Sequence, residues 1–349
     1  MNKELRKPTL DQIVAAKSTL EPEIIGLTRE QRNIYGYRFG VGKIRISLIA
    51  GCHADEPTGS IFLNHLTNFL GSLLPDHPLV ETFQWYLVPY ANPDGSHNNR
   101  YWSKEADQQF DLGLNLKYAI RELPGDDIEF GFPTDSVKSM RPENDAIYGF
   151  WKSANSKFNL HVSVHGMRIS YGPWFLIDKD FISEVAGILA ACKHEVELLK
   201  YHLHDVERKG EKGFFRFEPG FGSRPDSEAM KQHFRDLGDN EMAKRFHSSS
   251  MESIRSLGDP CLTLVTEMPL FIVPKDHSGL PWPDPTMSNW TERMNQWKLD
   301  IEQGQKNTRQ VTQEASDLGL RAMPIRDQMH LQWTFIWSGI VHQLSQVDQ

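Results

Sequence analysis

The chain has 349 residues, of which 39% are hydrophobic and 24% are charged, and its net charge at pH 7 is −8 with histidine neutral. These values are typical of a globular protein, and the length suits one α/β domain with additions. The acidic balance argues against a general nucleic-acid binder and against a protein that binds anionic membranes.

Cysteine usage and the N-terminal residues bear on the compartment. Cys52, Cys192 and Cys261 are too few and too scattered for a disulfide framework, and each lies in an apolar stretch, so we expect buried, reduced thiols. The N-terminus lacks the apolar run of a signal peptide, and no stretch has the length and apolarity of a membrane span. We therefore expect a cytoplasmic protein with no membrane or nucleic-acid partner.

The N-terminal part alternates helices and strands. Thr9 and Gln12 have capping-box spacing, which predicts a helix over residues 9–20. Strands are expected at 33–39, 43–50 and 83–90, with a helix at 60–74 before the last of them. A polar, charged loop then runs to about residue 142, and long loops of this kind in compact enzymes are usually functional.

The alternation continues through the middle of the chain. Helices are expected at 143–153 and 181–201, and short strands at 160–164 and 261–266. Residues 205–225 are Gly-rich and are expected to be irregular. This order predicts an α/β fold, in which ligands bind at the carboxyl ends of the strands.

The C-terminal segment has a different pattern. A Pro-rich linker at residues 280–285 precedes apolar residues at helical spacing in 290–301 and again in 329–344. We expect a catalytic domain over residues 1–275 and, over 276–349, the linker and a helical hairpin packed on that domain. The hairpin is predicted to be structural, either covering the body or forming a surface for homo-oligomers.

Chemistry-bearing residues fall at the predicted strand ends. His53 and Glu56 lie three positions apart on a Gly-rich turn after strand 43–50, where an imidazole and a carboxylate can converge on one metal ion. His165 ends strand 160–164, and the lone carboxylate of Glu267 ends strand 261–266. Taken alone, the His53–Glu56 pair fits a helix start with a surface carboxylate equally well.

Four short motifs in this order resemble the zinc carboxypeptidase family, the carboxypeptidase A-like metallopeptidases. They are residues 51–56 (Gly-Cys-His-Ala-Asp-Glu), 92–95 (Asn-Pro-Asp-Gly), 163–166 (Ser-Val-His-Gly) and 266–269 (Thr-Glu-Met-Pro). The resemblance covers roughly residues 33–271 and implies a mixed, mostly parallel central sheet flanked by helices. The C-terminal hairpin lies outside it.

The resemblance implies a set of site residues. His53, Glu56 and His165 would hold one zinc ion, with water in the remaining position. Glu267 would act as the general base that takes the proton of the water and passes it to the leaving amine. Arg100, which follows residues 92–95 closely, matches an arginine that stabilises the oxyanion.

The sequence departs from the family at the substrate-binding positions. Asp55 stands where an arginine is usual and would repel a substrate carboxylate. In residues 110–117, Asn115 matches the asparagine of the Asp-Leu-Asn-Arg run, but either register loses its arginine. Candidate cations to replace that arginine are Lys117, Arg121 and Arg168, although lysine cannot form the bidentate fork.

Two further positions are placed by the resemblance near the substrate. His247 falls near the usual tyrosine of the family, and Glu252 falls where the side-chain pocket is often lined, which would favour a basic group. These residues, with Asp55, Asn115 and Arg168, make up the predicted substrate-binding set.

The favoured hypothesis is a zinc-dependent hydrolase that cleaves a peptide or amide bond in a small peptide or amino-acid derivative. One alternative is an N-acyl amino acid deacylase that resembles aspartoacylase and succinylglutamate desuccinylase. Another is a non-catalytic zinc-binding protein, against which the spare carboxylate of Glu267 argues. The fold alone does not select among these functions.

Overall fold

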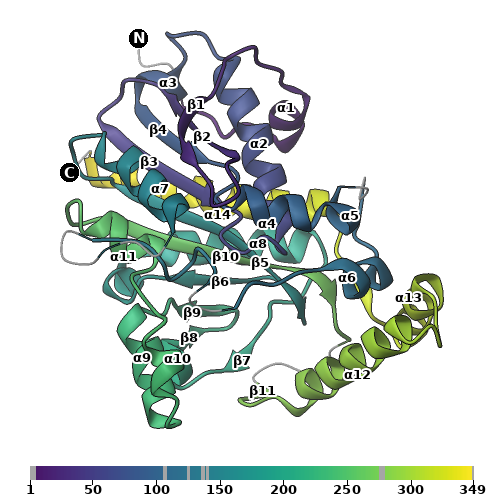
Figure 1. Cartoon of the computed structure of the whole chain (residues 1–349). Coiled ribbons are helices and arrows are strands. Elements are labelled where there is room, and N and C mark those ends of the chain that lie inside the picture. The colour runs from purple at the N-terminus through teal and green to yellow at the C-terminus, as the bar shows by residue number, and fades with distance from the viewer. Residues whose placement is uncertain are drawn as a thin grey trace.

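The structure is a computed structural model that describes residues 5–104, 108–123, 126–134, 138, 141–274 and 280–347. Helices lie on both faces of a large mixed sheet, and a smaller helical lobe stands at one side (Figure 1). The described residues contain no helix that is long and apolar enough to cross a membrane.

Ten strands of the described chain form the main sheet. They are β1 (Glu23–Leu27), β2 (Asn33–Phe39), β3 (Ile44–Ala50), β4 (Phe83–Val88), β5 (Leu160–Ser170), β6 (Trp174–Ile177), β8 (Arg216–Glu218), β9 (Phe221–Ser223), β10 (Leu262–Ile272) and β12 (Arg321–Ala322). Two further strands, β7 (Val206–Glu207) and β11 (Leu280–Pro281), form a small parallel pair of their own.

The strand order is β1-β2-β4-β3-β5-β10-β6-β9-β8, with β12 on the end of β10. The four central strands β4, β3, β5 and β10 are parallel, whereas β1, β2 and β6 join antiparallel. The predicted fold class is therefore confirmed.

The helices are mostly short and lie in the connections between strands. They are α1 (Leu10–Ala15), α2 (Pro57–Gly71), α3 (Pro78–Glu81), α4 (Pro93–Asn98), α5 (Arg100–Ser103), α6 (Leu112–Tyr118), α7 (Pro142–Lys152), η1 (Lys179–Glu184), α8 (Ala186–Leu198), η2 (Glu211–Gly213), α9 (Ser227–Asp236), α10 (Asn240–Ala243), α11 (Ser250–Arg255), α12 (Pro285–Glu302), α13 (Thr308–Asp317) and α14 (Ile325–Val347). The capping box of Thr9 and Gln12 is confirmed, but α1 ends at Ala15, earlier than predicted.

The sheet separates two apolar layers because successive side chains of a strand point to opposite faces. In β3, Ile46 and Leu48 join the larger core, which includes apolar side chains of α2, α8 and α14. Ile49 instead joins a second core with Phe150 of α7 and Ile254 of α11. All three cysteines are buried free thiols, as predicted.

Two predicted strands are longer than expected. The strand predicted to end at His165 continues as β5 to Ser170, and the strand predicted to end at Glu267 continues as β10 to Ile272. The two strands pair over this whole length, so their mutual pairing continues both strands past the residues at which the sequence pattern ended them. His165 and Glu267 therefore lie within strands, where the backbone is rigid.

The C-terminal segment does not form the predicted two-helix hairpin. The region between 290–301 and 329–344 contains a third helix, α13, and α12 and α13 pack against α6. α14 instead packs on α8, β10, α2 and β5 and lies behind the sheet in Figure 1. α14 has a near-continuous apolar face, which includes Leu331 and Phe335. This face is buried because the helix packs inside the main core.

Candidate metal centre and active site

Three neighbouring strands place His165, Glu267 and Trp174 in one row across the sheet. β5 and β10 pair with His165 opposite Glu267, and β10 pairs with β6 with Glu267 opposite Trp174. Residues directly opposite one another point to the same face of a sheet. Val265 packs with Trp174 on this face, whereas Leu264 belongs to the core on the other face.

The turn after β3 delivers His53 and Glu56 to the same place. Gly51 has a φ of 73°, a conformation that favours glycine, and it turns the chain away from the strand. Glu56 is the N-cap residue of α2, but its side chain makes no capping hydrogen bond. Its Oε2 lies 3.0 Å from Nδ1 of His165 and accepts a 3.1 Å hydrogen bond from the Gly166 N–H. The alternative of a solvated surface carboxylate is therefore wrong.

The donor set fits a zinc ion. The ligand atoms of His53, Glu56 and His165 all lie within 4.8 Å of one another, and the two imidazole rings meet edge to face with centroids 5.2 Å apart. Two nitrogens and one carboxylate oxygen are a ligand set of catalytic zinc, with bonds of about 2.0–2.2 Å. His165 is also fixed through its backbone, because the Thr266 hydroxyl accepts from its N–H at 3.2 Å and donates to its carbonyl at 3.0 Å.

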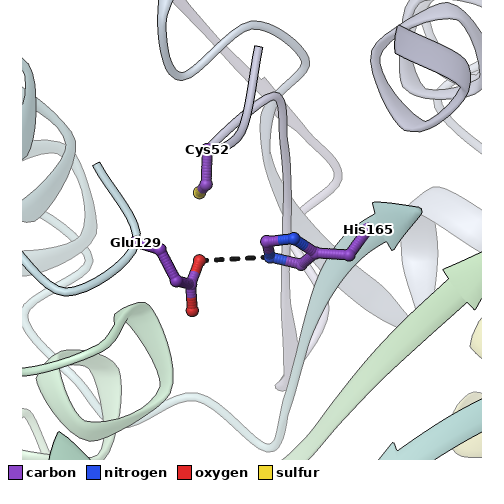
Figure 2. A group of neighbouring side chains, drawn as sticks. All are labelled: Cys52, Glu129 and His165. Atoms are coloured by element: carbon purple, nitrogen blue, oxygen red, sulfur yellow. Dashed lines mark ion pairs between the residues drawn. The ribbon is translucent and has the colours of Figure 1, made fainter. Parts of the chain in front are cut away.

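A second group of possible ligands, Cys52, Glu129 and His165, shares one histidine with the first. Figure 2 shows the Glu129 carboxylate facing His165, and the distance to Nε2 is 3.1 Å. Glu56 contacts Nδ1, so the two carboxylates hold opposite nitrogens of one ring. Burial and then the charge of Glu129 raise the pKa of the Cys52 thiol well above its ordinary value. We therefore assign Glu129 to orienting His165.

His53 has a carboxylate partner of the same kind. Oδ2 of Asp127 lies 3.7 Å from Nδ1 of His53, and Oδ1 of this buried residue has no hydrogen-bond partner within the described residues. Burial, reinforced by the charge of Glu129, raises the pKa of Asp127 to about 7. Burial lowers the pKa of His53 well below its ordinary value, which favours the neutral imidazole that binds metals. Carboxylates of this kind fix the tautomer and the ring orientation of ligand histidines.

Glu267 has the properties expected of a general base that is not itself a metal ligand. Its carboxylate is outside both candidate ligand groups, although it stands opposite His165 in the strand register. Burial raises the pKa of Glu267 to about 8, and the nearby charge of Glu56 adds to this shift. A catalytic carboxyl with a pKa near the working pH can both take up and release a proton.

Asp55 does not present unpaired charge to a substrate, which corrects the expectation of repulsion. Its Oδ1 lies 3.0 Å from Nη1 of Arg121, and the same nitrogen lies 2.6 Å from Oε1 of Glu56. Burial alone would raise the pKa of Glu56, but electrostatic interactions with His53 and Arg121 outweigh it and hold that pKa far below the ordinary range. Arg121 is thus engaged with two carboxylates of the site.

The other two predicted substitute cations differ in position. Burial lowers the pKa of Arg168, and the charge of Asp55 opposes that shift, so Arg168 lies in the field of Asp55. Lys117 instead lies over the ring of Tyr118, with Nζ 4.9 Å from the ring centroid. The pairing of Arg121 with the site could not be read from sequence, because Arg121 lies about 65 residues from its two partners.

Arg100 lines a cavity of about 630 Å³ that Glu56 also borders. Its Nη1 donates to the His97 carbonyl at 2.6 Å, and the guanidinium lies 4.1 Å from the ring centroid of Tyr101. The proposed role of Arg100 in stabilising an oxyanion stays a prediction.

The remaining predicted substrate residues lie in three separate places. Asn115 is buried in α6, and its Oδ1 lacks a hydrogen-bond partner among the described residues. The His247 N–H donates to the Phe130 carbonyl at 2.7 Å, which places it beside the loop that carries Glu129. Glu252 accepts from Ser249 and Ser227 as part of a capping box, so the structure gives it a stabilising function in α11.

Sequence reasoning missed both carboxylates that contact the histidines. Asp127 and Glu129 lie in the polar loop that was predicted to be functional, and the apolar Ile128 between them is buried. The available signal was the pair of carboxylates flanking an apolar residue in a loop already predicted to be functional; the turns that bring them to the histidines depend on the folded chain.

A family model matches the part of the chain that carries the three candidate zinc ligands. Residues 8–174 match the family model described as zinc carboxypeptidase. The resemblance to that family is confirmed. The zinc carboxypeptidase match includes His53, Glu56 and His165, while Glu267 lies beyond its end, so the position of Glu267 rests on the strand register. No curated protein sequence matches the chain.

Several solved structures are similar to this chain at low sequence identity. Carboxypeptidase A from Helicoverpa armigera is 14% identical with a TM-score of 0.44, over 97% of this chain and 72% of that one. A metallo-carboxypeptidase from Burkholderia cenocepacia is 14% identical with a TM-score of 0.47, over 92% of this chain and 64% of that one. A metallo-carboxypeptidase from Pseudomonas aeruginosa is 16% identical with a TM-score of 0.42, over 74% and 58%.

Proposed function

We propose that this protein is a zinc-dependent hydrolase that cleaves a peptide or amide bond in a small peptide or amino-acid derivative, in the manner of a carboxypeptidase. The family match supports a metallopeptidase. The observation that carries the proposal is the position of Glu267: a buried carboxyl with a raised pKa, opposite the metal-facing His165 yet outside the ligand set.

The residues of this chain divide the chemistry between them. His53, Glu56 and His165 would hold the zinc, which supplies Lewis acidity that polarises the scissile carbonyl and makes water more acidic. Glu267 takes a proton from the water while the oxygen of that water bonds to the carbonyl carbon. When the C–N bond breaks, Glu267 returns that proton to the leaving nitrogen. Asp127 and Glu129 keep the two imidazoles oriented throughout.

The test compares hydrolysis by the zinc-loaded protein with that by two variants. The substrates are N-acetyl-Gly-Phe, its C-terminal amide and N-acetyl-Phe. Glu267→Gln is expected to lower kcat about 10²–10⁴-fold while zinc content is unchanged, because glutamine keeps the shape and removes the base. His165→Ala is expected to lose zinc as well as activity. Glu241→Gln, at an exposed residue paired with Lys244, is the matched control and should retain both.

The outcomes separate the alternatives. Hydrolysis of N-acetyl-Phe alone would favour the N-acyl amino acid deacylase instead. Zinc binding with no hydrolysis of any substrate would favour the non-catalytic zinc-binding protein. Full activity in Glu267→Gln would contradict the role given to this residue.

A further inference from the structure

A guanidinium that the family match does not reach stands next to the row of His165, Glu267 and Trp174. Arg208 directly follows β7, and Trp282 directly follows β11. These two strands pair in parallel, with Glu207 opposite Pro281, so the next residues of the two strands meet. The small sheet thus brings together two parts of the chain that are over 70 residues apart.

Aromatic rings hold the guanidinium of Arg208 in place. Its Cζ lies 4.2 Å from the ring centroid of Trp282 and 4.9 Å from those of Trp174 and Phe214. A cation packed against several aromatic faces is stabilised without a counter-ion and keeps its donor groups for another partner. Trp174 is the strand neighbour of Glu267, so the stacked guanidinium lies beside the candidate base.

Within the described part of the chain, Arg208 forms no ion pair with an acidic side chain. Among the residues that the structure describes, none offers a carboxylate within 4.0 Å of the Arg208 side chain. Burial lowers the pKa of Arg208, and the attraction of Glu267 and Glu211 only opposes that shift. Lys212 is a second cation close to Arg208. Its pKa is lowered first by burial and then by the charge of Arg208.

Arg121, which lies next to the candidate metal ligands, is already paired with Asp55 and Glu56. The charge of Asp55 also acts on Arg168. A partly buried, positively charged position that lacks a partner is complementary to an anionic group on the substrate.

We propose that Arg208, held by Trp174, Phe214 and Trp282, binds a carboxylate of the substrate and thereby selects substrates that carry one beside the scissile bond. The inference rests on the proposed hydrolase function and names the substrate class for it. The carboxylate can belong to the C-terminus or to an acidic side chain, because a guanidinium recognises both through the same two-pronged hydrogen bonds.

The experiment uses the full-length, zinc-loaded protein and two pairs of peptides that differ only in a carboxylate. N-acetyl-Gly-Phe carries a terminal carboxylate and is compared with its neutral amide. N-acetyl-Gly-Glu amide carries a side-chain carboxylate and is compared with the neutral N-acetyl-Gly-Gln amide. The wild type is expected to favour at least one acidic peptide over its neutral counterpart by about 10- to 100-fold in kcat/KM. Which acidic peptide is favoured identifies the source of the carboxylate.

Three variants assign that preference to Arg208. In Arg208→Ala, the ratio of kcat/KM for the acidic peptide to kcat/KM for the neutral peptide is expected to fall close to one. The main cause should be a higher KM for the acidic peptide, with the zinc content unchanged. Arg208→Lys should restore part of the ratio, because it keeps the charge and loses the fork. Arg293→Ala is the matched control, since Arg293 also stacks on tryptophans, 6.0 Å from Trp290 and 5.9 Å from Trp297, away from the site.

Two results would overturn the inference while the hydrolase proposal stands: a wild type without preference for either acidic peptide, or an Arg208→Ala variant that keeps the preference. If no peptide is hydrolysed, the hydrolase proposal fails, and calorimetry then decides the role of Arg208 separately. In the zinc-loaded Glu267→Gln background, Arg208→Ala should weaken binding of the favoured acidic peptide about 10- to 100-fold. Equal binding with and without Arg208 would refute the inference.

Discussion

The two histidines of the candidate zinc site each face a carboxylate that the motifs do not contain. Asp127 faces Nδ1 of His53, and Glu129 faces Nε2 of His165. Both carboxylates are buried, and Oδ1 of Asp127 has no hydrogen-bond partner among the described residues. Such arrangements are costly in an apolar interior unless a cation is bound nearby, so they are consistent with a metal site.

Asp127→Asn is predicted to weaken zinc binding about 10- to 100-fold, because asparagine keeps the size of the side chain but removes the charge that orients His53. Competition with a chelator of known zinc affinity measures the change. Asp126→Asn, at the exposed neighbouring residue, is the control and should leave the zinc affinity unchanged. Equal affinities for the wild type and Asp127→Asn would exclude the orienting role.

The raised pKa of Glu267 predicts how the stability of the zinc-free protein depends on pH. The folded state raises this pKa from 4.5 to about 8, so between these values the folded state holds a proton that the unfolded chain releases. The contribution of Glu267 to the free energy of unfolding is fully present below pH 4.5. It falls by about 1 kcal/mol per pH unit as the pH rises towards 8.

Glu267→Gln removes this titration. The zinc-free variant is therefore predicted to be more stable than the zinc-free wild type at neutral pH, with a gap that grows between pH 5 and pH 8. Urea unfolding at several pH values measures it, and Glu241→Gln should follow the wild type. A gap that does not change with pH would show that burial of the carboxylate is not the cause.

Among the secondary-structure elements, the β5–β10 pair determines the geometry of the site. The parallel register runs from Leu160 opposite Leu262 to Ser170 opposite Ile272, well beyond the site at His165. Gly166 permits this close approach, because a Cβ there would lie 2.7 Å from the Met268 carbonyl oxygen. The backbone of the same residue donates to Glu56, which connects the strand pair to the start of α2.

Gly166→Ala is predicted to destabilise the protein by about 1–3 kcal/mol and to lower its zinc occupancy. The added methyl group would clash with β10, so the hydrogen-bonded backbones of β5 and β10 would have to move apart. Gly149→Ala is the control, since no atom lies within 4 Å of a Cβ at that position of α7, and it should be neutral or stabilising. Thermal unfolding and metal analysis of both variants distinguish the steric effect of Gly166 from a general effect of replacing glycine.

Across the whole molecule, local patterns predicted what is encoded locally. The capping box at Thr9 and the apolar strands leading to His53 and Glu267 could be read from a few neighbouring residues. The contacts of Arg121 and Arg208 could not, because each depends on residues far away in the sequence that only the folded chain brings together. The same reason explains why α14 was predicted to pair with its neighbour in sequence when it packs in the main core.

The position of α14 makes this C-terminal helix part of the main core. Leu331, Phe335, Ile336 and Ile340 are fully buried in the core beneath the sheet. Trp333 is 1% exposed, its Nε1 donates to the Pro8 carbonyl at 2.8 Å, and its ring packs near Phe62 of α2. The helix therefore supports α2, whose first turn carries Glu56. Self-association through the C-terminal segment stays a prediction.

A chain truncated before Pro285 is predicted not to fold, because the main core would lose α14. A milder form of the same prediction is Trp333→Ala, which should cost about 3–5 kcal/mol through the cavity it leaves and the hydrogen bond it removes. Leu299→Ala, at a side chain of α12 that is 46% exposed, should change stability by less than about 0.5 kcal/mol. Denaturant unfolding compares the two variants. A truncated chain that remains soluble and binds zinc as tightly as the full chain would show that the site does not depend on α14.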